Sequence, residues 1–326
     1  MSDTLPKSTK DMSPEEMATF MAHINGPQAE PQVAVQPQNP LQAYFRHPEL
    51  YMTLPSGGRW YRPGALDMPE NGEIEVFPMT AKDEILLKTP DTLLNGKATM
   101  NVIKSCIPSI KQPEHIPAVD IDTVLISIRI ASYGEEMDVD SECHHCGYSN
   151  THGIDLRNMI DGIRCPDYTQ PLIMEDGLQV FFKPTSYGES NLANMEKFEE
   201  ERLIAAITSS ETTEEDKMIQ FNRSFEILTD LTLRLTLDSI SHMTTPDGAE
   251  VVDRGFIQSF LENCGSTGFA LIKDRIKEYK DIIEMKPLMM VCGNPELDET
   301  AEEENTLVCN KQYETPLVFD QSHFFG

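Results

Sequence analysis

Two closely spaced cysteines in the middle of the chain constrain its fold more than any other feature. Cys143 and Cys146 are separated by two residues, and Gly147 follows directly. This spacing allows one tight turn to direct both sulfurs at a single cation, and the glycine gives the backbone freedom where a side chain would crowd the metal. The segment therefore predicts a zinc knuckle. One knuckle supplies only two of the four ligands that a structural zinc ion needs.

Two further cysteines near the end of the chain are candidates for the missing ligands. Cys292 follows the apolar run 287–291, and Cys309 follows the apolar pair 307–308, with an acidic stretch, residues 294–305, between them. We interpret this repeated pattern as a second knuckle that the acidic stretch splits. The predicted zinc site is then a closed tetrahedral set with a structural role, formed by Cys143, Cys146, Cys292 and Cys309.

The same residues allow other assignments. Cys292 and Cys309 also suit buried positions in an apolar core, where a free cysteine behaves as a small hydrophobe. Another group would then complete the site, and the candidates in reserve are His144, His145, Cys165 and His323. Cys106 and Cys264 lie at apolar helix positions and are predicted to be core residues.

The charge balance restricts the partners that this chain can bind. It has 54 acidic and 26 basic residues, which gives a formal net charge of −28 over 326 residues. Such a surface repels phosphate backbones and anionic lipid, so the composition argues against nonspecific binding of nucleic acid or membranes and favours a basic protein partner.

Other features of the sequence favour an intracellular location. No stretch approaches the ~20 apolar residues that span a bilayer. The first residues show no charged region followed by an apolar run, so no secretory signal is expected. Seven cysteines spread thinly over the chain suit metal binding or buried thiols in a reducing compartment.

Residues 1–42 are predicted to form a flexible tail with one short amphipathic helix. Ser13 is a strong helix cap followed by proline and two glutamates, and a Pro- and Gln-rich stretch follows the helix. The apolar side chains that share one face of this helix are Met17, Phe20, Met21 and Ile24. Two interpretations stay open: the helix docks in a groove of a partner protein, or it folds back on its own domain.

The remaining chain is predicted to be an α+β fold. It divides into a mixed N-terminal domain (43–140), a zinc-ribbon-like β element that joins the middle of the chain to its end (141–165 plus 286–326), and a mostly helical insertion (166–285). Residues 120–132 fit both strand and helix periodicity, and their length favours a helix. In the insertion, helices over 189–208 and after Thr213 carry apolar stripes that predict core packing, and Ser266 is the expected cap of a third helix.

The sequence lacks the common catalytic motifs. It contains no P-loop, no Gly-x-Ser-x-Gly elbow and no His-Glu-x-x-His motif. Cys143 and His144 superficially suggest a nucleophile beside a base, but adjacent residues at a knuckle point in different directions. We therefore expect a protein without enzymatic activity.

Several stretches together resemble the base plate protein family of T-even-type tailed phages, which contains baseplate hub and hub-assembly proteins. The resemblance runs in unbroken order over about residues 45–155. It rests on the segments His47–Pro48, Leu54–Gly58, Val76–Glu84, Thr89–Gly96, Ser105–Pro108, Asp120–Gly134 and the first cysteine knuckle. Family members typically show two knuckles, and this chain departs from that pattern at Cys292.

The resemblance implies a virus protein without enzymatic activity, made in the host cytoplasm, that helps to assemble the central baseplate hub of the tail. Its partners would be other baseplate hub proteins, and it would act as an assembly chaperone or remain in the virion as a hub subunit. The competing hypothesis is a zinc-ribbon nucleic-acid-binding or regulatory protein. That hypothesis needs a basic face, whereas the residues around the knuckle include Asp138, Asp140, Glu142 and Asp155.

Overall fold

The computed structural model divides into two units, Met1–Phe45 and Arg46–Gly326. The structure describes residues 13–15, 17–19, 41, 44–88, 96–209, 213–294 and 309–315. In the first unit, the described residues between 14 and 19 are helical and exposed, and the Met17 N–H donates to the Ser13 carbonyl at 2.9 Å. The predicted helix therefore begins where expected. Its other apolar residues, Phe20, Met21 and Ile24, lie outside the described residues.

The second unit begins with helices packed on a small antiparallel sheet. Strand β1 pairs with β2, and their inward-facing residues join the buried faces of the helices in one apolar core. The sequence favoured a helix over residues 120–132, and helix α5 confirms this. The elements are β1 (Leu50–Met52), β2 (Ile74–Val76), α2 (Ala81–Leu87), α4 (Lys97–Cys106), η2 (Pro113–His115) and α5 (Ala118–Tyr133).

A polar network fixes the start of this unit to α2 and α4. The Arg46 guanidinium donates to the Pro78 carbonyl at 2.5 Å and to the Ser105 carbonyl at 2.6 Å. Ser105 Oγ in turn donates to the Asp83 carboxylate at 2.9 Å. Asp83 also closes a capping box with Thr80 at the start of α2, as the sequence predicts. These partly buried groups satisfy one another and so fix the chain that enters the core.

A buried carboxylate holds the loop that precedes residue 60. Asp120 on α5 accepts hydrogen bonds from the backbone N–H of Ser56 at 2.8 Å and from its hydroxyl at 2.5 Å. Burial raises the pKa of Asp120, and the bonds from Ser56 partly offset that rise. The loop leads to Trp60, whose φ of 67° is unusual for a large side chain and whose ring lies 5.1 Å from the Tyr168 ring.

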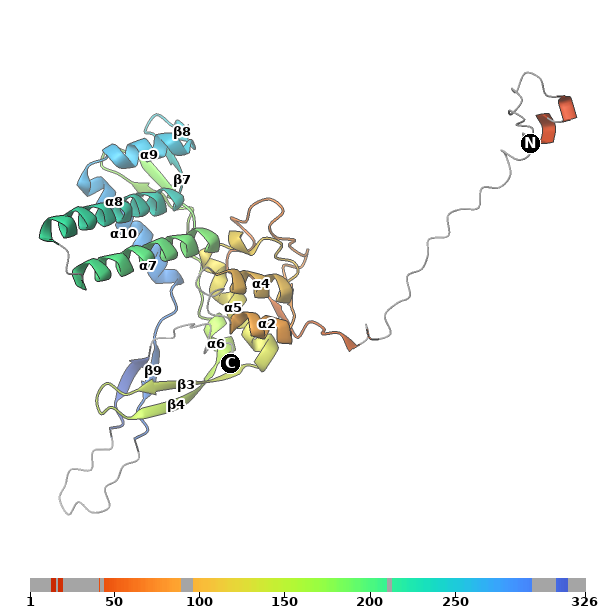
Figure 1. Ribbon diagram of the computed structural model, residues 1–326, viewed down its shortest axis with the longest axis horizontal. Helices are drawn as coiled ribbons and strands as arrows, with labels where there is room; N and C mark the ends of the chain where they lie inside the picture. Colours follow the sequence, from red (N-terminus) through yellow and green to blue (C-terminus); the bar gives the residue numbers. More distant parts are fainter. Residues whose placement is uncertain are drawn as a thin grey trace, which may run out of the picture. The chain divides into compact units, whose positions relative to one another are not determined.

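The next part of the chain combines a four-stranded antiparallel sheet with long helices. The strand order is β5-β6-β7-β8, and the first two strands form the hairpin predicted around Asp176. Helices α7 and α8 run side by side in Figure 1. The elements are β5 (Leu172–Ile173), β6 (Gln179–Phe182), α7 (Tyr187–Ser209), α8 (Glu214–Asp238), β7 (Ile240–Thr244), β8 (Glu250–Val251), α9 (Arg254–Asn263) and α10 (Ser266–Ile283).

Two details of this helical part differ from the sequence predictions. Several residues of the α7 and α8 stripes are more than half exposed rather than in the core, namely Leu192, Phe198, Met218 and Phe225. The two helices pack on each other as a pair, so only part of each stripe is covered. The cap of α10 is Gly265 instead of Ser266, which is the first helical residue, whereas Thr213 caps α8 as predicted.

The α+β class predicted from sequence is confirmed, with a ribbon-like element between the middle and the end of the chain. No helix in the described part of the chain is long and apolar enough to cross a membrane.

Candidate metal centre

The first knuckle is the turn of a regular hairpin. Strand β3 (Glu136–Glu142) pairs antiparallel with β4 (Ser149–Asp155), and the last pair before the turn joins Glu142 to Ser149. In the turn, the Cys143 N–H donates to the Tyr148 carbonyl at 2.9 Å. Gly147 has φ +71°, the left-handed conformation that glycine adopts at little cost. The hairpin predicted around this knuckle is therefore confirmed.

The second knuckle lies between two other antiparallel strands, β9 (Leu288–Val291) and β10 (Gln312–Thr315). The pair nearest the turn joins Val291 to Gln312, and the Cys292 N–H donates to the Lys311 carbonyl at 3.0 Å. Asn310, directly after Cys309, has φ +34°. Asparagine is one of the few residues other than glycine that tolerates this region. The predicted strand before Cys292 is confirmed, while residues 307–308 lie outside the described residues.

The two knuckles correspond position by position. In each, the residue before the first cysteine pairs with the residue three places after the second cysteine. In each, the N–H of the first cysteine donates to the carbonyl two places after the second, and the residue directly after the second has a positive φ. Sixteen residues separate Cys292 from Cys309, yet the ends of this segment have the backbone geometry of a contiguous knuckle.

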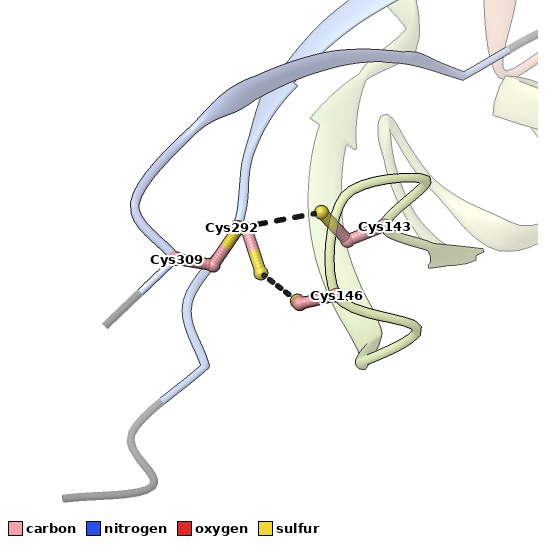
Figure 2. A group of neighbouring side chains, drawn as sticks. All are labelled: Cys143, Cys146, Cys292 and Cys309. Atoms are coloured by element: carbon pink, nitrogen blue, oxygen red, sulfur yellow. Dashed lines mark hydrogen bonds between the residues drawn. The ribbon is translucent and has the colours of Figure 1, made fainter. Parts of the chain in front are cut away.

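The four sulfurs lie together in the geometry that a tetrahedral metal requires (Figure 2). Cys143 Sγ is 3.7 Å from Cys309 Sγ, Cys146 Sγ is 3.6 Å from Cys292 Sγ, and all four atoms lie within 4.8 Å of one another. Zinc–sulfur bonds of about 2.3 Å in a tetrahedron place the sulfurs about 3.8 Å apart. A disulfide would need about 2.05 Å, and all four cysteines are free thiols. The donor set and its spacing thus fit zinc.

Asn150 on β4 links the two knuckles, a role that the sequence did not predict. Its side chain is 5% exposed, and its Oδ1 accepts from the Gly293 N–H at 2.7 Å. Its Nδ2 donates to the Tyr148 carbonyl at 3.0 Å and lies 3.7 Å from Cys292 Sγ. The one sequence signal for this role was that Asn150 is a polar residue in the strand directly after the knuckle. Its partner across the chain could not be identified from the sequence.

Tyr313 on β10 makes a second link between the hairpins. Its side chain is buried, and its hydroxyl lies 2.7 Å from Ser141 Oγ and 3.3 Å from His152 Nε2. The first hairpin supplies both of these partners. The side chains of Tyr313 and Asn150 therefore hold the two strand pairs together beside the sulfurs.

The surroundings of the sulfurs affect their ionisation unequally. Burial raises the pKa of the Cys143 thiol, but hydrogen bonds from the backbone of His145 and Cys146 outweigh it and bring the pKa down to about 7. Burial raises the pKa of Cys292. Zinc binds thiolates, so a bound ion would stabilise the deprotonated form of all four cysteines.

The reserve ligands do not join the four sulfurs. His144 and His145 are exposed, and His144 packs edge-on near the Tyr313 ring at a centroid distance of 6.3 Å. Cys165 lies elsewhere, with Sγ 3.5 Å from the Pro166 carbonyl. His323 is outside the described residues. Among the described residues, the potential metal-binding groups that lie together are Cys143, Cys146, Cys292 and Cys309; that they bind zinc remains a prediction.

The fold and the four-cysteine centre define an α+β protein in which a zinc-ribbon-like element joins the middle of the chain to its end. A family model described as T4 bacteriophage base plate protein matches residues 47–286, most of the chain. The chain belongs to this family, and it is a phage baseplate protein. The match includes the first knuckle and ends just before β9, so the second knuckle lies outside it. Searches of the curated proteins and of the solved structures found no match.

Proposed function

We propose that this protein acts, without enzymatic activity, in assembly of the central hub of the phage tail baseplate. It binds other hub proteins in the host cytoplasm, as an assembly chaperone or as a hub subunit that stays in the virion. Membership of the baseplate family is the observation that carries this proposal. The net charge of −28 is consistent with binding through protein surfaces.

The four cysteines are proposed to hold one structural zinc ion. A closed thiolate set leaves no open position for a substrate, so the ion would contribute folding energy instead of catalysis. By joining Cys143 and Cys146 to Cys292 and Cys309, it would fix the end of the chain to its middle.

We also propose the domain division that the sequence predicts, with residues 43–140, 166–285 and the bipartite ribbon as separate folding regions. Three apolar clusters support it in outline, although the first also takes in Leu156 and Ile163 of the predicted ribbon region. One lies mainly among β1, β2, α4 and α5, one between the four-stranded sheet and helices α9 and α10, and one beside the sulfurs.

Nucleic-acid binding by the ribbon is less consistent with the surface around it. Strand β3 carries Glu136, Asp138, Asp140 and Glu142 in alternation, and all four side chains are exposed or partly exposed. Carboxylates in this arrangement repel a phosphate backbone.

Affinity capture from infected cells tests the assembly role. Tagged protein should co-purify with hub proteins from assembly intermediates, and parallel analysis of mature virions distinguishes the two roles. Presence in intermediates alone indicates a chaperone, and presence in both indicates a structural subunit. Recovery of no baseplate protein from either source would contradict the proposal.

Deletion of residues 1–40 tests the predicted docking helix separately. Weaker co-purification with an unchanged melting temperature supports a partner groove for Met17, Phe20, Met21 and Ile24. Unchanged co-purification removes the helix from the proposed interaction.

A further inference from the structure

A groove of about 560 Å³ is lined by residues of α7, α8 and α10. One face of α10 borders it with Lys273, Lys277 and Lys280, spaced i, i+4 and i+7, and Lys183 borders it from the end of β6. The first three are exposed and Lys183 is partly exposed. Four lysine side chains therefore line one concave surface.

This concentration of positive charge contrasts with the rest of the chain. Acidic residues outnumber basic ones by 54 to 26 overall, yet the groove lining holds four lysines and one carboxylate, that of Glu284. None of the four lysines forms an ion pair with another residue that the structure describes. Lys183 attracts the Glu189 carboxylate at longer range. Unpaired lysines around a concavity raise the local concentration of anionic groups.

The rest of the groove lining suits an apolar side chain. Its large apolar residues include Phe182, Leu235, Ile276 and Tyr279. The residues that α7, α8 and the C-cap of α8 supply are largely small, namely Ser190, Ala193, Thr232, Thr236 and Ser239. Small residues allow a partner backbone to approach closely, so apolar side chains of a partner can contact the large apolar residues while its carboxylates meet the lysines.

We infer that this groove binds an acidic amphipathic segment of a partner protein. The inference rests on the proposed function, because it names the chemistry of one surface through which the protein binds other baseplate proteins. A second copy of this chain is disfavoured because association would oppose two charges of −28. The groove is distinct from the four-cysteine centre, with which it shares no lining residue.

Isothermal titration calorimetry with the full chain and synthetic peptides at physiological ionic strength tests this inference. The probe is a helical peptide of about 16 residues with Glu on one face and Leu on the other. Two matched peptides replace every Glu by Lys, or every Leu by Ser. The protein variants are Lys277→Glu/Lys280→Glu in the groove and Lys82→Glu/Lys104→Glu, the same charge change at exposed positions on α2 and α4.

The acidic amphipathic peptide should bind, and the groove variant should weaken binding about tenfold or more, while the control variant stays within about twofold. Three results would overturn the inference: no binding of the acidic peptide, equal binding by the groove variant, or equal binding of the Leu-to-Ser peptide, which would indicate a simple anion site. Self-association that the groove variant abolishes would assign the groove to a second copy instead. None of these results bears on co-purification with hub proteins, so failure here is distinguishable from failure of the assembly role.

Discussion

The knuckle at Cys143 and Cys146 is contiguous in sequence, whereas sixteen residues interrupt the knuckle at Cys292 and Cys309. The backbone hydrogen bond that the first cysteine donates, the strand register and the positive-φ residue are nevertheless the same in both. The geometry at the two ends of the turn therefore defines a knuckle. The number of residues between the cysteines does not.

Removing one sulfur from either knuckle tests whether the two are equivalent. Cys143→Ser and Cys292→Ser should each reduce bound zinc from about one ion per chain to nearly none, because three thiolates do not close the tetrahedral site. Elemental analysis of the purified protein measures this loss. Cys264→Ser is the control, since Cys264 lies outside the cluster. Zinc retained in Cys292→Ser alone would show that another group completes the site and that the knuckles differ.

Asn150→Ala tests the link between the knuckles. It removes the acceptor for the Gly293 N–H and the donor to the Tyr148 carbonyl in a buried position. We expect the free energy of unfolding, from urea denaturation, to fall by about 2–3 kcal/mol. Asn158→Ala, at an exposed position near the first hairpin, should change it by less than about 0.5 kcal/mol. Equal effects of the two substitutions would mean that Asn150 does not couple the hairpins.

A pH titration distinguishes the electrostatic interaction between Asp122 on α5 and Glu284 from the metal centre. Burial, and then the nearby Glu284 carboxylate, raise the pKa of Asp122 to about 6. The folded state therefore binds a proton more tightly than the unfolded state, and stability falls as pH rises through about 4 to 6. Asp122→Asn should remove this loss, leaving the variant more stable than the parent by about 2 kcal/mol at pH 7 relative to pH 4.

The metal centre provides a control for this titration, because its contribution to stability is expected to change with pH in the opposite direction to that of Asp122. Bound zinc would be released as the thiolates are protonated, so the centre is expected to lose stability as pH falls. A difference between Asp122→Asn and its parent that does not change with pH would contradict the assigned pKa.

Deletion of residues 295–308 converts the split knuckle into a contiguous one, Cys292-Gly293-Asn294-Cys309-Asn310. The variant should retain zinc and gain about 1–2 kcal/mol of stability, because a shorter loop loses less entropy on closure. Thermal denaturation measures the change. A Gly/Ser segment of the original length is the matched control, with no expected gain. Loss of zinc only in the deletion would show that the two ends lie too far apart for a two-residue turn.

The smallest expected effect concerns the residue after the second cysteine. Gly147→Ala should cost about 1 kcal/mol because of its positive φ; a Cβ there would meet its nearest neighbouring atom only at 3.6 Å, so sterics add little. Asn310→Gly should leave the unfolding free energy within about 0.5 kcal/mol, or raise it slightly. A clear loss of stability in Asn310→Gly would indicate that its side chain has a role that Gly147 lacks.

Local signals predicted much of the fold. The capping box at Thr80, the cap at Thr213, the helix predicted over residues 120–132 and the hairpin around Cys143 all depend on neighbours within a few residues. The convergence of the four sulfurs could also be predicted from chemistry, because one knuckle supplies only two of the four ligands that a structural zinc ion needs. Their binding of zinc remains a prediction.

What the sequence could not predict depends on distant partners. The amphipathic stripes of α7 and α8 show which residues are apolar, but the helices cover only part of each stripe, and Phe225 and Met218 are exposed. Asn150 and Asp120 look like ordinary polar residues until Gly293 and Ser56 lie beside them. Neither partner is close in sequence, so no periodicity marks the pair.

The packing of Trp60 against Tyr168 provides an intrinsic fluorescence probe of this contact. The chain has a single tryptophan, with the Arg59 guanidinium 4.6 Å from its ring, and it packs partly buried against the core between the sheet and α9 and α10. Its emission will therefore report selectively on whether the loop held by Asp120 stays attached to that core. A red shift of this emission before global unfolding would show that the loop detaches from the core first, and no added label is needed to detect it.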